Sequence, residues 1–378
     1  MTGGSADVLD QVSALLKRVG LDATDLSLDQ VAHSRWLTRG IWRVSISGVP
    51  MVLKYLSVER DLGETMWHAH WSAGSGAPRH WNYWAREGLA YLEGITNAYA
   101  GSGLGSANAA SVDLTERDCV LLLEFVDGVP AERWHMADYV PAAEALGRAQ
   151  GSYLVDRPIP GHPWLSGGFL RDYSREKPAD WSLLSDDRAW DQPVVKRNFP
   201  AKLRPAATWL HESRDRLYGI MDRLPRTLCH LDFWTKNLIR RPDGEIALLD
   251  WAFVGDGAIG EDAGNLVPDA VLDHFVPAQK LPEFETAVLD GYLNGLRQAG
   301  WAGDARLVQL GMWAAAVKYD WQTPMMLEAA QATRQYRYGG TEEIDADHRF
   351  QERGLALLHN ANTARRAVAL ADAIGIGP

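Results

Sequence analysis

The segment of residues 229–262 constrains the fold of this chain more than any other part of the sequence. Its polar residues follow a fixed spacing and are His230, Asp232, Asn237 and Asp250. Two short apolar runs flank residues 241–244, whose Pro-Asp-Gly sequence strongly favours a turn. The segment is therefore predicted to be a loop followed by a β-hairpin, which brings Asn237 and Asp250 to one point.

These residue types suit the transfer of a phosphoryl group. That reaction needs metal ions that neutralise phosphate charge and a carboxylate that orients the attacking hydroxyl. Mg²⁺ prefers oxygen ligands and keeps several waters, so one carboxylate and one amide oxygen suffice beside the phosphates. We predict that Asp250 and Asn237 bind Mg²⁺ and that Asp232 orients the hydroxyl and accepts its proton. His230 is expected to support the loop through backbone hydrogen bonds.

The pattern H-x-D-x-x-x-x-N, then a hairpin and an aspartate, resembles the catalytic segment of the protein-kinase-like fold. Its details are similar to the aminoglycoside phosphotransferase and choline kinase branch. Trp251 follows Asp250 where protein kinases have phenylalanine, and residues 255–262 are similar to the G-D-P-x-x-D element of that branch. Trp234 stands two residues after Asp232, where peptide kinases have a lysine, and no Ala-Pro-Glu sequence marks an activation segment.

The resemblance implies an α+β, two-lobed protein-kinase-like fold. A small N-terminal lobe would hold an antiparallel sheet, and a larger C-terminal lobe would be mainly helical. We place the boundary after the apolar run 118–126. Residues 1–127 would form the nucleotide-binding lobe with its N-terminal helix, and residues 128–378 would carry the catalytic loop, the metal site and the acceptor-binding helices.

The resemblance also implies roles for residues of the N-terminal lobe. Lys54, near the end of the third predicted strand, would contact the α- and β-phosphates of the nucleotide, and Glu87 would be its ion-pair partner. The backbone of a hinge segment would bind the adenine edge. The hinge residues are Glu124, Phe125 and Val126. Asp262 is expected to be structural, as a helix cap behind the catalytic loop.

Two pairs of residues are candidates for binding the acceptor. In aminoglycoside kinases, acidic loops of the C-terminal lobe hold substrate ammonium groups by charge-assisted hydrogen bonds. Glu342 and Glu343 lie in such an acidic stretch, and a solvated loop is the alternative interpretation. The resemblance places Asp320 and Trp321 near the acceptor cleft, and packing at a helix end is the alternative for them.

Periodicity predicts the elements around this site. An amphipathic helix occupies the N-terminus, because Val8, Val12, Leu15, Leu16 and Val19 share one face. Short strands are predicted at 33–37, 41–47 and 51–55, and a helix at 79–95. Further helices are predicted at 141–154, 206–224, 282–300, 305–319 and 347–374, with an irregular insertion at 156–200.

Composition limits the partners of the chain. The formal net charge of −11 over 378 residues argues against nucleic-acid binding as the main task. The absence of an 18-residue apolar run argues against a membrane-spanning helix, and the first residues do not read as a signal peptide. Two cysteines exclude a disulfide framework. We expect a cytoplasmic monomer or homodimer.

Together these features predict an enzyme that moves the γ-phosphate of ATP, with GTP as the alternative donor, to a hydroxyl of a small molecule. An aminoglycoside, a nucleoside-type antibiotic or an amino sugar is the expected acceptor, and antibiotic resistance a role that fits. One alternative is a nucleotide-binding regulator without transfer activity. The other is a protein kinase, against which Trp234 and the missing activation segment argue.

Overall fold

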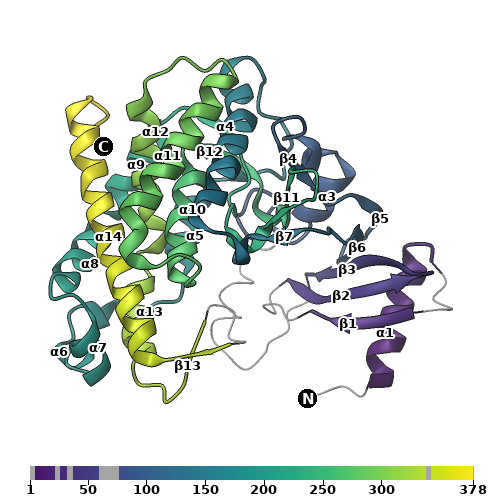
Figure 1. Ribbon diagram of the computed structural model, residues 1–378, viewed down its shortest axis with the longest axis horizontal. Coiled ribbons are helices and arrows are strands. Elements are labelled where there is room, and N and C mark those ends of the chain that lie inside the picture. Colours follow the sequence, from purple (N-terminus) through teal and green to yellow (C-terminus); the bar gives the residue numbers. More distant parts are fainter. Residues whose placement is uncertain (1–4, 22–25, 32–36, 59–75, 338–341, 378) are drawn as a thin grey trace.

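The computed structural model describes residues 5–21, 26–31, 37–58, 76–337 and 342–377. Figure 1 shows a small lobe built on a sheet beside a larger lobe built mainly of helices. The expected two-lobed α+β fold is confirmed. The strand predicted at 33–37 lies outside the described residues except for Leu37.

The sheet of the small lobe has the order β1-β2-β3-β6-β5, and every neighbouring pair is antiparallel. Its strands are β1 (Leu26–Gln30), β2 (Thr38–Ile46), β3 (Val49–Ser57), β5 (Ala109–Leu114) and β6 (Asp118–Glu124). Side chains alternate between the two faces of a strand, so Leu53 and Lys54 of β3 point to opposite sides of the sheet. Because β3 is the central strand, the position of Lys54 is firmly fixed.

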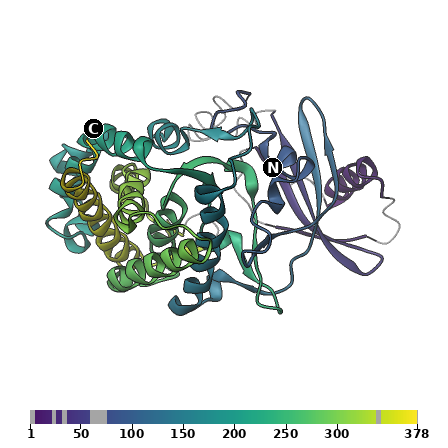
Figure 2. The ribbon, with the colours of Figure 1, turned by 90° about the horizontal axis from the view of Figure 1, so that it is seen from above.

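Helix α1 (Ser5–Arg18) covers one face of this sheet, at the far right of Figure 2. Val12, Leu15 and Leu16 recur at helical spacing and are buried against Trp42 and Leu53. The predicted amphipathic helix is confirmed. Since α1 occupies the Leu53 face, the Lys54 face is the one that turns toward the large lobe.

The helix predicted at 79–95 is much shorter in the structure. Helix α3 covers only Arg86–Leu92, and turns precede it. The side chain of Arg86 donates hydrogen bonds to backbone carbonyls of the preceding segment. These carbonyls belong to Pro78, His80 and Trp81. Carbonyls satisfied by a guanidinium do not need helical partners, and this explains why the segment winds as turns.

The large lobe is a bundle of helices (Figure 1). They are α4 (Tyr139–Val155), α5 (Phe169–Glu176), α6 (Asp187–Trp190), α7 (Pro193–Asn198), α8 (Leu203–Glu212), α9 (Arg214–Arg223), α10 (Glu261–Leu272), α11 (Leu281–Gln298), α12 (Ala305–Ala314), α13 (Gln322–Ala329) and α14 (Ala346–Ala373), with the 3₁₀ helix η8 (Ala315–Tyr319) after α12. Among the described residues, no helix is long and apolar enough to cross a membrane.

Several helix predictions are confirmed and others need correction. Helices α4, α11 and α14 match the predictions at 141–154, 282–300 and 347–374. The helix predicted at 206–224 is divided at Ser213 into α8 and α9, and the one predicted at 305–319 ends as the 3₁₀ helix η8. The bounds of helix α10 were not predicted. Asp262, expected as a helix cap, lies in its first turn, and Gly260 is the N-cap without a side-chain cap. The helix supplies part of the site described below.

A small sheet joins the lobes and carries the predicted hairpin. Its order is β4 (Leu104–Ser106), β11 (Ile246–Leu248), β10 (Leu238–Arg240) and β7 (Val129–Pro130). Strands β10 and β11 are antiparallel and pair Leu238 with Leu248. The backbone nitrogen of Leu249 also donates to the carbonyl oxygen of Asn237 at 2.8 Å. The hairpin therefore delivers Asn237 and Asp250 to the same end of the sheet, as the turn sequence predicts.

Candidate active site

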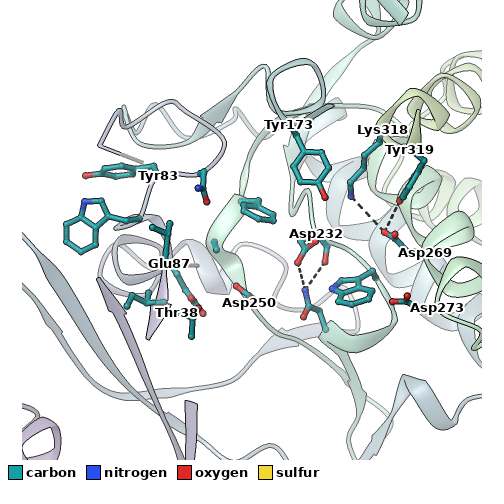
Figure 3. Close-up of a pocket in the computed structure, with 18 of the residues that line it drawn as sticks. Thr38, Tyr83, Glu87, Tyr173, Asp232, Asp250, Asp269, Asp273, Lys318 and Tyr319 are labelled. Carbon is teal, nitrogen blue, oxygen red and sulfur yellow. Dashed lines mark hydrogen bonds and ion pairs between the residues drawn. The ribbon is translucent and has the colours of Figure 1, made fainter. Parts of the chain in front are cut away.

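A cavity lies between the two lobes, and Figure 3 shows residues that line it. Strand β3 supplies Lys54 and the first turn of α3 supplies Glu87. The segment with the fixed spacing supplies Asp232, Asn237 and Asp250. Residues that are far apart in the sequence are thus gathered around one space.

Lys54 links the two lobes through carboxylates. Its ammonium Nζ lies 2.6 Å from Oε2 of Glu87 and 3.2 Å from Oδ1 of Asp250. Burial opposes the charge on Lys54, but Asp250 and Glu87 outweigh it and raise the pKa of the lysine. Burial also raises the pKa of Glu87, which Lys54 offsets only in part. The lysine is therefore held charged at the inner end of the cavity.

Asp262, in the first turn of α10, holds the catalytic loop from behind. Its Oδ2 accepts a hydrogen bond from the backbone nitrogen of His230 at 2.8 Å, and its Oδ1 accepts one from Leu231 at 2.7 Å. Gln150 of α4 donates to the same carboxylate. Leu231 has a φ of 65°, which a bulky side chain rarely adopts. These bonds hold the loop in this strained shape.

Asn237, in the 3₁₀ helix η5 (Thr235–Asn237), orients Asp232 within that loop. Its Nδ2 donates to the backbone oxygen of Asp232 at 3.0 Å and to the carboxylate Oδ2 at 2.8 Å. Burial raises the pKa of Asp232 to about 7, with Asp250 and Asp269 acting in the same sense and Lys318 opposing them. A carboxylate with a pKa near neutrality can accept a proton and release it again.

Asp250 turns into the cavity because its backbone is left-handed, with a φ of 59°. Aspartate tolerates this conformation better than most residues. The 3₁₀ helix η6 (Trp251–Phe253) begins directly after it. The turn brings the carboxylate to 3.2 Å from Nζ of Lys54, although two-fifths of the Asp250 side chain remains exposed.

The donor set at this point fits a hard divalent cation. Asn237 uses its amide nitrogen to bind Asp232, so its amide oxygen is the group available to a metal. Asp250 adds a carboxylate that faces the cavity. One carboxylate and one amide oxygen match what Mg²⁺ takes from a protein when phosphates supply further ligands.

Arg86 connects three segments around Glu87 by hydrogen bonds. Its side chain is fully buried and donates five hydrogen bonds of 2.5–3.0 Å to backbone carbonyls. Three of these carbonyls precede α3, one belongs to Trp164 of the large lobe, and one belongs to Ala252, two residues after Asp250. The guanidinium therefore fixes the start of α3 against the loop that carries Asp250.

The other half of the cavity is built by the large lobe. Asp269 and Asp273 come from the end of α10, Lys318 and Tyr319 from η8, and Tyr173 from α5. The hydroxyl of Tyr319 donates to Oδ2 of Asp269 at 2.7 Å. Figure 3 shows this half on the opposite side of Asp232 from Glu87 and Asp250.

The sequence pattern of the phosphotransferase enzyme family (APH) matches residues 98–305, which is more than half of the chain. The chain belongs to this family. No curated protein matches the sequence. The resemblance to aminoglycoside phosphotransferases and choline kinases, and the nature of the chain as a small-molecule phosphotransferase acting on hydroxyl groups, are thereby confirmed.

Two solved structures share the fold of this phosphotransferase. Amicoumacin kinase hAmiN, in complex with AMP-PNP, Ca²⁺ and Ami, has a TM-score of 0.51 and 12% identity, over 98% of this chain and 94% of that one. A Plasmodium vivax ethanolamine kinase has a TM-score of 0.50 and 11% identity, over 96% of this chain and 91% of that one. At such identities the likeness concerns the fold.

The predicted hinge residues, 124–126, are not among the described residues that line the cavity. The carboxylate of Glu124 binds the side chains of Asn108 and Arg241. The guanidinium of Arg43 lies 4.2 Å from the ring centre of Phe125, and Val126 is buried. The role of this backbone toward adenine stays a prediction.

The four residues predicted to bind the acceptor are placed differently. Trp321 lines the cavity, whereas Asp320 is buried with Oδ2 3.7 Å from His211, outside the cavity lining. Glu342 and Glu343 are exposed around the short strand β14 (Glu343–Ile344) and form ion pairs with Arg337 and Arg334. Their charges are neutralised on the surface, and the structure does not bring them to the site.

Sequence reasoning missed the residues that do face the acceptor half of the cavity. Asp269 and Asp273 are spaced four apart. Asp269 interrupts the largely apolar stretch 263–272, and Asp273 directly follows it. This spacing puts both on one face of a helix, and a search for carboxylates on buried helices finds them. Tyr173 carries no comparable signal, because it lies in the insertion at 156–200 that was predicted to be irregular. Lys318 lies in the helix predicted at 305–319, but no pattern there sets it apart.

His230 is fully buried and its ring packs edge-on against Trp251, with ring centres 4.9 Å apart. Burial lowers the pKa of His230 to about 4, although the neighbouring backbone of Asp232 and Leu249 favours the charged ring. The imidazole is therefore neutral at physiological pH. Neither ring nitrogen has a hydrogen-bond partner among the described residues, so the His230 side chain forms none of the expected hydrogen bonds to the loop backbone and contributes by packing.

Arg86→Met is expected to destabilise the protein by more than about 3 kcal/mol, because several buried carbonyls lose a hydrogen-bond donor at about 1–3 kcal/mol each. Arg86→Lys should recover little, since an ammonium cannot reach five carbonyls. The midpoint of urea unfolding is the measurement, with the exposed Arg188→Met as control. A midpoint of Arg86→Met equal to that of the control would contradict the role.

His230→Gln tests the buried neutral imidazole through pH. In the unfolded chain this histidine binds a proton near pH 6.5, whereas the folded chain resists protonation down to about pH 4. Wild type should therefore lose about 1.4 kcal/mol of stability per pH unit from this group as pH falls through that window. The difference in free energy of unfolding between wild type and variant, measured by urea unfolding, should therefore shrink from pH 7 to pH 5. A gap that is the same at both pH values would rule the assignment out.

Proposed function

We propose that this phosphotransferase moves the γ-phosphoryl group of ATP to a hydroxyl of an aminoglycoside, a nucleoside-type antibiotic or an amino sugar. The observation that supports this most is the meeting of Lys54, Asp232, Asn237 and Asp250 in one cavity between the lobes. GTP is the alternative donor. AMP-PNP and Ca²⁺ in the amicoumacin kinase structure agree with a nucleotide and a divalent cation at such a site.

In this proposal each residue that lines the cavity has a separate role. Lys54, held by Glu87, binds the α- and β-phosphates. The Asp250 carboxylate and the Asn237 amide oxygen would hold Mg²⁺, which neutralises phosphate charge. Asp232 orients the acceptor hydroxyl for in-line attack. The acceptor oxygen bonds to the γ-phosphorus, the bond from phosphorus to the β-γ bridging oxygen breaks, and the hydroxyl proton passes to Asp232.

The division into lobes belongs to the same proposal. Residues 1–127 would bind the nucleotide, and residues 128–378 would supply the catalytic loop, the metal ligands and the acceptor wall. Strand β4 at residues 104–106 pairs with β11 of the catalytic hairpin, so the two units share a sheet. The acceptor would lie against Tyr173, Asp269 and Trp321, which line the far half of the cavity.

Asp232→Ala should remove phosphoryl transfer while leaving nucleotide affinity nearly unchanged. A general base of this kind contributes roughly 10²–10⁴-fold to the rate. The measurement is Mg-ATP consumption with a panel of aminoglycosides, nucleoside antibiotics, amino sugars, choline and homoserine, with Asp243→Ala of the exposed hairpin turn as control. Equal turnover by Asp232→Ala and the control would exclude Asp232 as the base. ATP binding without turnover on any acceptor would favour a nucleotide-binding regulator.

Asp250→Ala should abolish the Mg-dependent part of nucleotide binding, because it removes the only carboxylate assigned to the metal. Titration calorimetry with ATP, in the presence of Mg²⁺ and of EDTA, measures this difference for wild type and variant. Retained folding is checked by circular dichroism. If Asp250→Ala keeps a Mg-dependent affinity for ATP, Asp250 is not the metal ligand.

A further inference from the structure

Lys318 places a second buried ammonium in the cavity, at the end opposite Lys54. It comes from η8, its residue is 4% exposed, and it lines the cavity together with Asp232 and Asp269. Figure 3 shows its nitrogen directed toward these two carboxylates. Among the described residues that line the cavity, Lys54 and Lys318 are the two with a positive charge.

The described residues offer the ammonium of Lys318 no close hydrogen-bond acceptor. Its nearest carboxylate oxygen, Oδ2 of Asp269, is 3.9 Å away and already accepts the Tyr319 hydroxyl at 2.7 Å. A hydrogen bond from nitrogen needs about 2.7–3.2 Å. Aromatic rings surround it instead, at 5.4–5.7 Å from their centres. These rings belong to Phe169, Tyr173 and Tyr319.

Such an arrangement is costly without a ligand. An ammonium carries three donors, and a buried charge without hydrogen bonds is unfavourable. Lys177, whose side-chain nitrogen lies 4.2 Å from the ring centre of Tyr173 and 4.4 Å from that of Trp321, does not line the cavity, and burial together with Lys318 lowers its pKa. An anionic oxygen entering the cavity next to Asp232 would supply the hydrogen-bond acceptor that the ammonium of Lys318 lacks.

The catalytic loop does not place a positively charged side chain at this end of the cavity. Trp234 lines the cavity, whereas Lys236 is exposed, with its ammonium 5.8 Å from the ring centre of Trp234. Lys54 is engaged by Glu87 and Asp250 at the other end. Lys318 is therefore the cation positioned where the phosphoryl group meets the acceptor.

We propose that Lys318 binds an anionic oxygen of the transferring γ-phosphoryl group, and is a catalytic residue of the reaction. This rests on the function proposed above. During transfer, charge spreads over the equatorial oxygens of the phosphoryl group, and a preorganised cation in a site without bulk water stabilises it. Lys318 keeps its protons throughout, and Asp232 receives the proton of the acceptor.

The test compares nucleotides that differ in the γ-phosphoryl group. Affinities for AMP-PNP and ADP, each with Mg²⁺, are measured by calorimetry for wild type, Lys318→Met and Lys318→Arg. The exposed Lys280→Met is the matched control. Lys318→Met should bind AMP-PNP about ten- to a hundredfold more weakly while its ADP affinity stays within about twofold of wild type. Lys318→Arg should restore most of the AMP-PNP affinity.

A second readout separates this role from a structural one. Methionine fills nearly the same space without a buried charge, so Lys318→Met should unfold at a temperature no lower than wild type. With an acceptor that is turned over, kcat should fall while KM for the acceptor stays unchanged.

Three results would overturn the proposal. An unchanged ratio of AMP-PNP to ADP affinity in Lys318→Met would show that Lys318 does not contact the γ-phosphoryl group. A raised KM for the acceptor with kcat intact would assign the ammonium to an anionic group of the acceptor instead. Failure of wild type to bind either nucleotide with Mg²⁺ would remove the proposed function itself, and the role of Lys318 with it.

Discussion

The ion triad of Lys54, Glu87 and Asp250 is the interaction on which the arrangement of this enzyme depends. It joins the central strand of the small lobe, helix α3 and the loop after the catalytic hairpin. Lys54 and Glu87 are buried, so breaking their pair would leave two charges unpaired in a medium of low dielectric, whereas Asp250 is two-fifths exposed. The triad therefore sets the position of one lobe on the other, and with it the width of the cavity. Two further buried charges support it by binding backbone: Arg86 ties α3 to the Asp250 loop through carbonyls, and Asp262 holds the Asp232 loop through amides.

The chemical centre of the molecule could be predicted from sequence because its residues are close together along the chain. The hairpin between Asn237 and Asp250 is encoded by local turn chemistry, so their meeting follows from a short segment. Lys54 and Glu87 could be placed only through the resemblance, since their pairing depends on how a sheet and a helix pack. Arg86 marks the limit of such reasoning. Periodicity predicted a long helix at 79–95, yet α3 begins only at Arg86, whose side chain binds carbonyls of the residues before it.

The acceptor wall could not be predicted, and the reason is physical. Its residues come from α5, α10 and η8, which contact one another only after the helices of the large lobe have packed. Acidity alone misled the prediction for Glu342 and Glu343, because surface carboxylates find arginine partners nearby. The informative carboxylates, Asp269 and Asp273, stand among apolar residues instead. A charge that is buried needs a partner or a task, and this makes it a better guide to a site than a run of exposed charges.

Charge in the acceptor half of the cavity is largely compensated within the protein. Asp269 has the Tyr319 hydroxyl and Lys318, and Asp273 has Arg353 at 3.6 Å. The rings of Tyr173 and Trp321 already lie against the side-chain nitrogen of Lys177. Asp232 is then the carboxylate best able to attract an acceptor by charge. Such a wall recognises a ring-containing acceptor through the faces of its rings and through hydrogen bonds.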